Sequence, residues 1–275
     1  MALLAVKLLL APSFVVGASL AARRFGPRVG GLIAGLPVVA GPILLAYALA
    51  HGRAFAAGAA AGTLLGLVSL IAFVVVYARL AGRMFWGASM LAGWLAFALG
   101  TAAFSTVSLP AGAALGLAGA GLLAGLALLP RPGREVAVQL PPPAWDLPLR
   151  AACAIALVLT LTAVAGWLGP QLSGLLAPFP IIATVLATFT HAQRGTDELL
   201  RLLRGLVSGF GAFALFCFVL AVSLRRLDTL SAFALATGLA LIAQATILAL
   251  GPRGPAPATR SLAATPGAVP KRAVP

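Results

Sequence analysis

Apolar stretches of about 20 residues recur along the whole chain, and this length suits a helix that crosses a lipid bilayer. Of the 275 residues, 61% are hydrophobic and only 9% are charged, whereas soluble domains carry roughly 25% charged residues. The apolar runs do not alternate with polar residues, as the strands of a membrane β-barrel do. The sequence therefore predicts an all-α polytopic membrane protein whose main partner is the lipid bilayer.

Nine membrane-spanning helices are expected. They cover residues 4–22, 29–50, 55–78, 84–104, 108–130, 149–168, 171–191, 204–224 and 229–250. The Pro-rich segment 131–150 is the only long polar connection and is expected to form a semi-rigid strap. The sequence ASLAA at 18–22 resembles a signal-peptide cleavage site, but the repeat described next needs the first span, which we expect to stay in the mature protein.

Two apolar segments that contain prolines and glycines resemble each other, GPRVGGLIAGLPVVAGP at 26–42 and GPQLSGLLAPFPIIATV at 169–185. Aligning Pro27 with Pro170 sets an offset of 143 residues, the difference between those two numbers. At this offset several residues coincide without a gap: Gly26/Gly169, Gly31/Gly174, Pro37/Pro180, Gly52/Gly195 and Arg83/Arg226. We interpret the pattern as an internal duplication in which spans 1–4 recur as spans 6–9, with span 5 as a connecting helix.

The duplication predicts the organisation of the chain and the orientation of its halves. Because corresponding helices of the two copies are five spans apart, an odd number, the second copy enters the membrane inverted. The expected parts are a first transmembrane repeat at 1–104, a connecting helix with a Pro-rich linker at 105–148, a second inverted repeat at 149–250, and a disordered basic cytoplasmic tail at 251–275. The fold class is thus two inverted-topology four-helix repeats plus one connecting helix.

The basic residues are distributed unevenly between alternate loops. Cytoplasmic loops accumulate Lys and Arg, and this bias sets the orientation of membrane helices. Fifteen of the nineteen basic residues fall on one side: Arg23, Arg24, Arg28, Arg79, Arg83, Arg131, Arg134, Arg150, Arg194, Arg201, Arg204, Arg253, Arg260, Lys271 and Arg272. The other side has Arg53, Arg225 and Arg226, and Lys7 lies within the first span. This predicts an outer N-terminus and a cytoplasmic C-terminus, and it accounts for the net charge of +14 without a nucleic-acid partner.

The prolines Pro37 and Pro180 fall close to the centres of the second and seventh spans. A central proline removes one backbone hydrogen bond and clashes with the preceding turn, and in lipid the freed carbonyl needs a partner in protein or in a water-filled cavity. Inverted repeats with broken helices at matching positions are typical of secondary transporters, which bind substrate at the membrane midplane. The candidate substrate-binding residues are Gly35, Pro37, Tyr47, Pro178, Pro180, Thr184 and Thr188.

Other chemistry is not indicated. The sequence has no HExxH, GxSxG or CxxC motif and no paired intramembrane aspartates, so we expect no enzyme, no metal site and no cofactor. The five acidic residues, Glu135, Asp146, Asp197, Glu198 and Asp228, all lie in or beside expected loops, which argues against simple coupling through a central carboxylate. His51 and His191 are expected to anchor helix ends at the interface.

Two further patterns have alternative interpretations. The charged segment 191–205 is either a site for a phosphate or lipid head group, or a solvated loop and helix start with i,i+3 and i,i+4 ion pairs. The GxxxG pairs Gly62/Gly66 and Gly205/Gly209 are expected to let helices approach a neighbour closely. Cys153 and Cys217 are expected to be small core residues.

The second copy contains GLLAPFPIIATVLATFTHAQRG at 174–195, which resembles the small four-helix GlpM-like membrane proteins. The matching positions are Gly174, Pro178, Phe179, Pro180, His191, Arg194 and Gly195. The first copy departs from the pattern, with Leu36 and Ala48 in place of Phe179 and His191. The resemblance implies two fused GlpM-like units in a bacterial inner membrane, a family loosely linked to exopolysaccharide production and without a settled biochemical activity.

Two classes of function follow as expectations. The first is a permease- or flippase-like transporter for a small neutral, anionic or lipid-like substrate, with its site between the two proline-broken helices. The alternative is a non-transporting membrane scaffold, or a subunit of an envelope or exopolysaccharide assembly, in which the prolines only kink packed helices. The identity of the substrate and the oligomeric state stay open at this point.

Overall fold

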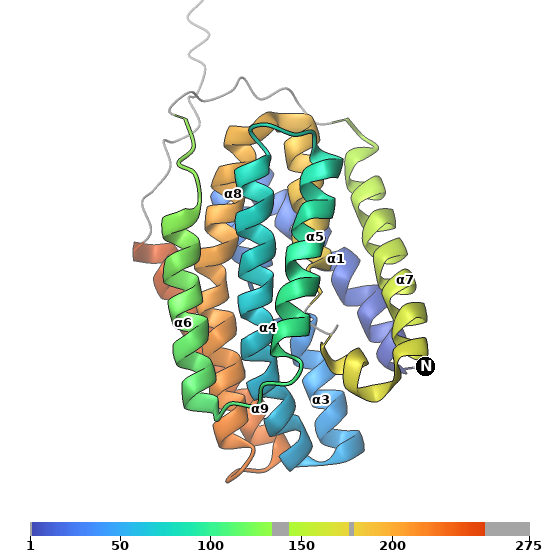
Figure 1. The fold of residues 1–275 in the computed structure, drawn as a ribbon, viewed down its shortest axis with the longest axis vertical. Helices are drawn as coiled ribbons and strands as arrows, with labels where there is room; N and C mark the ends of the chain where they lie inside the picture. Colours follow the sequence, from blue (N-terminus) through green and yellow to red (C-terminus); the bar gives the residue numbers. More distant parts are fainter. Residues whose placement is uncertain (1, 134–142, 176–178, 251–275) are drawn as a thin grey trace, which may run out of the picture.

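A computed structural model of the protein describes residues 2–133, 143–175 and 179–250, with side chains for residues 12–133, 143–160 and 179–250. The described residues form helices and no strand, which confirms the all-helical prediction for this part of the chain (Figure 1). The helices are α1 (Ala2–Phe25), α2 (Pro27–Ala34), α3 (Ala40–His51), α4 (Arg53–Leu80), α5 (Trp86–Phe104), α6 (Ala111–Leu128), α7 (Asp146–Leu175), α8 (Ile181–Ser223) and α9 (Thr229–Leu250). The predicted tail at 251–275 lies outside the described residues, as do residues 134–142 of the Pro-rich linker.

Five helices within the described residues, α4, α5, α6, α8 and α9, are long and apolar enough to cross a membrane. Helices α4 and α8 are mostly buried and form the centre, while α5, α6 and α9 lie at the periphery (Figure 1). The outer face of α5 presents Leu91, Leu95 and Leu99, each about 60% exposed and spaced one helical turn apart. An outer surface of this kind suits contact with lipid.

The span predicted at 29–50 is wrong as a single helix. It is divided into α2, with 8 residues, and α3, with 12 residues, and neither reaches the roughly 20 residues that cross a bilayer. The chain leaves helical geometry between Gly35 and Val39, around Pro37. The helix is interrupted here because Pro37 has no amide hydrogen and cannot continue the hydrogen-bond ladder of a helix.

The loop predicted between the spans 171–191 and 204–224 is also wrong. Helix α8 continues through this region and is kinked only at Gly195, where φ is 81° and ψ is −177°. We call residues 181–194 its first arm and residues 196–223 its second arm. Gly52 has nearly the same geometry, with φ 86° and ψ 167°, between α3 and α4. A positive φ is accessible to glycine without steric cost, so one residue redirects the chain where the charged sequence suggests a loop.

The two central helices are antiparallel. At one end, Arg53 at the start of α4 donates a hydrogen bond from Nη1 to the carbonyl oxygen of Leu227, just beyond α8, over 2.8 Å. At the other end, Thr196 at the start of the second arm donates from Oγ1 to the carbonyl oxygen of Ala81, just beyond α4, over 3.2 Å. The bundle is therefore built around two long helices that run in opposite directions.

Glycines bring the short helix α2 into backbone contact with the second arm of α8. A Cβ atom at Gly205 would overlap the carbonyl oxygen of Arg28, and one at Gly209 would overlap that of Leu32. On the α2 side, a Cβ at Gly31 would overlap the carbonyl oxygen of Leu202. The pair Gly205/Gly209 thus makes the close approach that its spacing predicts.

We predict that Gly205→Ala pushes α2 away from α8 and lowers the free energy of unfolding by about 1–3 kcal/mol, the usual effect of overpacking. The matched control is Gly211→Ala on the same helix, where the new Cβ would lie an ordinary 3.6 Å from Ile247 Cδ1. That control is expected to be neutral, or to stabilise the protein by up to about 1 kcal/mol through helix propensity. Thermal unfolding of the purified protein in detergent measures both, and equal stabilities would contradict the contact.

Candidate functional site

The two proline breaks line one small cavity inside the bundle. Its volume is about 60 Å³, and both breaks contribute to its wall. The lining residues are Ala34, Gly35, Leu36, Pro37, Val39 and Ala40 from the first break, Phe179, Pro180, Ile181, Ile182 and Ala183 from the second, and Leu70, Leu206, Phe210 and Phe213 from α4 and α8. We call this space the interbreak cavity. It brings together segments that are far apart in the sequence.

The prolines have equivalent roles in the backbone at the two breaks. The carbonyl oxygen of Pro37 accepts a hydrogen bond from the amide of Gly41 over 2.8 Å, and that of Pro180 accepts one from Thr184 over 2.7 Å. Each proline therefore starts the helix that follows its break. At the first break, the carbonyl oxygen of Leu32 also accepts a hydrogen bond from Nε2 of Gln244, a buried residue of α9. This amide ties the end of α2 to α9.

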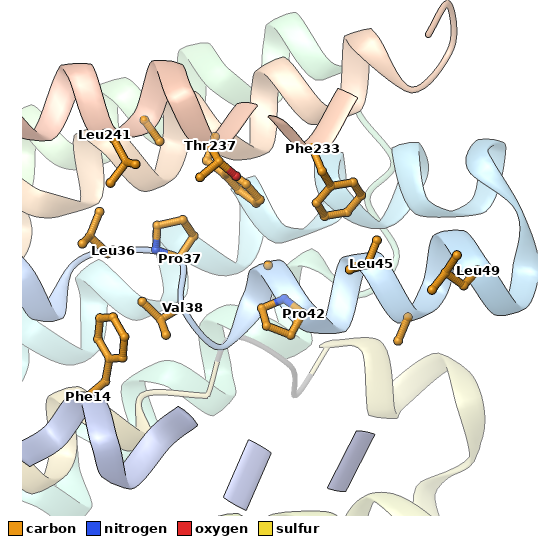
Figure 2. Close-up of a pocket in the computed structure, with 14 residues that line it drawn as sticks. Phe14, Leu36, Pro37, Val38, Pro42, Leu45, Leu49, Phe233, Thr237 and Leu241 are labelled. Atoms are coloured by element: carbon orange, nitrogen blue, oxygen red, sulfur yellow. The ribbon is translucent and has the colours of Figure 1, made fainter. Parts of the chain in front are cut away.

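A second, larger pocket lies beside the first break. Its volume is about 660 Å³, and we call it the Pro37 pocket (Figure 2). It is lined by Phe14 from α1, by Leu36, Pro37 and Val38 from the break, by Gly41, Pro42, Leu45, Ala46 and Leu49 from α3, by Phe216 from α8, and by Phe233, Thr237, Ala240 and Leu241 from α9. Among the described lining residues, Thr237 is the only one with a polar side chain. The pocket therefore fits an apolar group far better than an ion.

The equivalent place beside the second break is filled by aromatic side chains. Trp94 and Phe97 of α5 each lie with their ring centroids 5.5 Å from that of Phe179. The indole Nε1 of Trp94 donates a hydrogen bond to Oγ1 of Thr184 over 3.0 Å. The side chains that would have to leave for a pocket to form here are thus packed and hydrogen-bonded.

The structure separates the predicted site residues into two groups. Gly35, Pro37 and Pro180 line the interbreak cavity, and Pro37 also lines the Pro37 pocket. Pro178 lies outside the described residues. The other three candidates line neither space: Tyr47 packs its ring against Phe55, with centroids 5.4 Å apart, Thr184 bonds Trp94, and Thr188 lies half-buried on the first arm.

The residues that sequence reasoning missed are apolar ones. Phe14, Leu36 and Phe216 line the Pro37 pocket, but nothing in their chemistry distinguishes them from other core residues. Only the position of Leu36 could have indicated its role, because it directly precedes Pro37 at the break. Among the described residues, no group of His, Cys, Asp and Glu side chains is arranged to hold a metal ion.

A buried polar cluster joins three helices at one end of the bundle. Asp146, which begins α7, is only 1% exposed. Its carboxylate accepts hydrogen bonds from Arg23 of α1 over 2.6 Å, from Nε of Arg150 over 2.9 Å, and from Nε2 of Gln193 over 2.7 Å. The guanidinium of Arg150 also stacks on the ring of Phe189, 4.8 Å from its centroid. Burial by itself raises the pKa of Asp146, but the bond from Gln193 and the charges of Arg150 and Arg23 hold it below the ordinary value.

The charged segment 191–205 lies within α8 and is not a loop, whereas its role as a head-group site stays a prediction. The predicted i,i+3 pair is present, because Arg201 bonds Glu198 over 2.9 Å, but Glu198 is only 2% exposed. Arg204 donates to the carbonyl oxygen of Leu129 over 2.8 Å, and Arg79 of α4 donates to that of Leu128 over 3.0 Å. These carbonyls at the end of α6 have no partner within the helix, so the arginines cap it.

Comparison with family models, with curated proteins and with solved structures found no match for this chain. The resemblance of residues 174–195 to GlpM-like proteins therefore stays a prediction.

We predict that Asp146→Asn destabilises the protein by about 3–5 kcal/mol, because it leaves the buried charge of Arg150 without its partner. Since the pKa of Asp146 is lowered on folding, its contribution to stability is complete above the ordinary carboxyl pKa of about 3.9 and disappears as the pH falls through the folded value. The difference between parent and variant should therefore shrink below about pH 4. Thermal unfolding at neutral and acidic pH measures this, and a difference that is constant with pH would contradict it.

Proposed function

We propose that this protein is a permease- or flippase-like carrier whose substrate passes between the two proline breaks. The observation that carries the proposal is the interbreak cavity, to which residues 35–40 and 179–183 both contribute. Carriers built from inverted repeats place their site where two broken helices meet. The carrier is a multi-pass protein of a bacterial inner membrane, with its N-terminus outside and its C-terminus in the cytoplasm.

The inverted repeat is part of the proposal, and several helix boundaries support it. Leu80 and Ser223, where α4 and α8 end, are 143 residues apart, and so are Trp86 and Thr229, where α5 and α9 begin. Gly52 and Gly195, which share a positive φ, have the same separation. The antiparallel course of α4 and the second arm of α8 is the relation expected for inverted copies. Helix α6 has no counterpart and serves as the connecting helix.

The lining of both spaces supports a neutral or lipid-like substrate. Among the described side chains, none that lines the interbreak cavity or the Pro37 pocket is charged, so these residues would offer an inorganic ion no counter-charge in return for its lost hydration. At the breaks, the carbonyl oxygens of Pro37, Phe179 and Pro180 and the hydroxyl of Thr184 are already hydrogen-bonded. The Pro37 pocket supplies volume and apolar contact, which an amphiphilic or apolar molecule requires.

The alternative function, a non-transporting scaffold, is favoured by one observation. At about 60 Å³, the interbreak cavity has room for only a few water molecules. If the breaks never separate, no substrate passes between them, and the prolines only shape the packing of α2, α3 and α8. The two functions therefore differ in whether water reaches the breaks.

Cysteine accessibility separates the two functions. In a background that lacks Cys153 and Cys217, we would place single cysteines by Leu36→Cys and Ile182→Cys, one beside each break. Gly35 is unsuitable for this purpose, because a side chain there would meet the backbone of Gly209 at 2.8 Å. A membrane-impermeant thiol reagent is then applied to either side of sealed, oriented vesicles.

For a carrier, we predict labelling at both positions and from both sides of the membrane, because the site faces the two aqueous phases alternately. Arg83→Cys and Arg226→Cys, at opposite ends of the bundle, control for sidedness, and Leu95→Cys on the exposed face of α5 controls for lipid-embedded positions. If folded variants at 36 and 182 stay unlabelled while the sidedness controls react, the scaffold replaces the carrier.

A further inference from the structure

We propose that the Pro37 pocket holds one acyl chain of an anionic membrane lipid, with the lipid head group at the arginines of the α8–α9 loop. As a substrate site this deepens the proposed carrier function and rests on it. The proposal comes from three features of the described residues: the shape of the pocket, its asymmetry between the two halves, and the charges at its end.

The pocket extends along α3 and opens at its surface. Gly41, Leu45 and Leu49 line it at intervals of four residues, which corresponds to about 12 Å along the helix axis. Figure 2 shows Leu36 and Leu241 at one end, beside the break, and Leu49 and Phe233 at the other. Leu45, Leu49 and Leu241 are exposed as well as lining. An elongated apolar pocket that is open on its side suits a hydrocarbon chain entering from the membrane.

Among the described residues, the corresponding place in the second half is filled, and the difference can be assigned to side chains. At the offset of 143 residues, Trp94 corresponds to Thr237 and Thr184 corresponds to Gly41. The hydrogen-bonded pair Trp94–Thr184 fills the second half, whereas Thr237 and Gly41 leave the first half open. Small side chains at positions 41 and 237 therefore leave this volume open. Thr and Trp at these two positions would fill it, as Thr184 and Trp94 fill the second half.

The charges at the open end of the pocket are cationic. Leu49 lies two residues before the end of α3, and Phe233 lies four residues after the start of α9. The bond from Arg53 to the carbonyl oxygen of Leu227 holds the α8–α9 loop beside the start of α4, so the exposed Arg225 and Arg226 lie at this same end.

One carboxylate, Asp228, is present at this end, and its role is local. Asp228 accepts a hydrogen bond from the amide of Ser231 over 3.0 Å at the start of α9, and this bond lowers its pKa. No ion pair joins it to Arg225 or Arg226 among the described residues. Two exposed guanidiniums beside an apolar pocket complement a lipid with an anionic head group and a hydrocarbon chain.

The test is photo-crosslinking in phosphatidylcholine vesicles that contain the full-length protein. The probe is phosphatidylglycerol with a diazirine near the end of one acyl chain, and the matched probe is phosphatidylcholine with the same chain. Mass spectrometry then locates the crosslinked residues. We expect crosslinks at Leu36 and Leu241, at the end of the pocket away from Arg225 and Arg226, to exceed those at the lipid-facing leucines of α5 several-fold, and unlabelled phosphatidylglycerol to compete them away.

Two variants test the pocket and the charges separately. The double variant Gly41→Thr with Thr237→Trp introduces the Trp–Thr pair of the second half into the Pro37 pocket, and it should reduce crosslinking several-fold. The control Ile242→Trp adds an exposed tryptophan on α9 and should leave crosslinking unchanged. Arg225→Gln with Arg226→Gln should remove the preference for phosphatidylglycerol, and Arg83→Gln at the opposite end should leave it intact.

Three results would overturn the proposal: equal crosslinking of the two probes by the parent protein, crosslinking spread evenly over the pocket and α5, or no lipid crosslink in the pocket, as a second protein copy covering it would give. The lipid-binding proposal and the carrier proposal can fail separately. If unlabelled phosphatidylglycerol competes with the crosslinks but the breaks resist thiol labelling, lipid is bound and not transported. Labelled breaks without competed crosslinks would mean a carrier for another substrate.

Discussion

A backbone carbonyl released from a helix in an apolar surrounding needs a hydrogen-bond partner, and the arrangement around Pro37 depends on how this need is met. The carbonyl oxygen of Ile33, four residues before Pro37, accepts a hydrogen bond from the amide of Leu36 over 3.1 Å. That of Leu32 accepts from the amide of Gly35 over 3.1 Å and from Nε2 of Gln244 of α9. Local bonds thus satisfy the end of α2, and the bond from Gln244 also joins it to α9. The glycine contacts between α2 and α8 then place the break directly against the central helix.

Much of the helical arrangement was predictable from the sequence, because long uniform apolar runs have clear ends. The predicted spans 84–104 and 229–250 agree closely with α5 and α9. The corner at Gly195 was not predictable, because one glycine among 31 gives no sign that it adopts a positive φ, and the charges around it resemble a loop. At the candidate site, the prolines indicated the breaks through their missing amides. The walls of the Pro37 pocket could not be found, because an apolar residue that lines a pocket and one that fills a core have the same chemistry.

The two halves of the bundle have similar backbone geometry and different side-chain volume. Proline starts a helix in both, and glycine redirects the chain in both, yet Trp94, Phe97 and Phe179 fill one half while the other contains a pocket of about 660 Å³. The two halves therefore share residues that set the backbone and differ in residues that set the side-chain volume. A scaffold that needs only stable packing has no use for the open half, whereas a protein that binds an apolar molecule needs one half that is open and one that holds the bundle together.

Gly52 and Gly195 join helices without a loop, and this limits how the length of the chain can change. One residue inserted into a helix beside such a corner would rotate everything beyond it by about 100° and advance it by about 1.5 Å. The buried face of α4 or of the second arm of α8 would then point toward the surroundings. The connection STVSLP between α5 and α6, which is largely exposed, has no comparable restriction. Reporter domains and epitope tags inside the chain therefore belong at 105–110, and natural length variation should concentrate there.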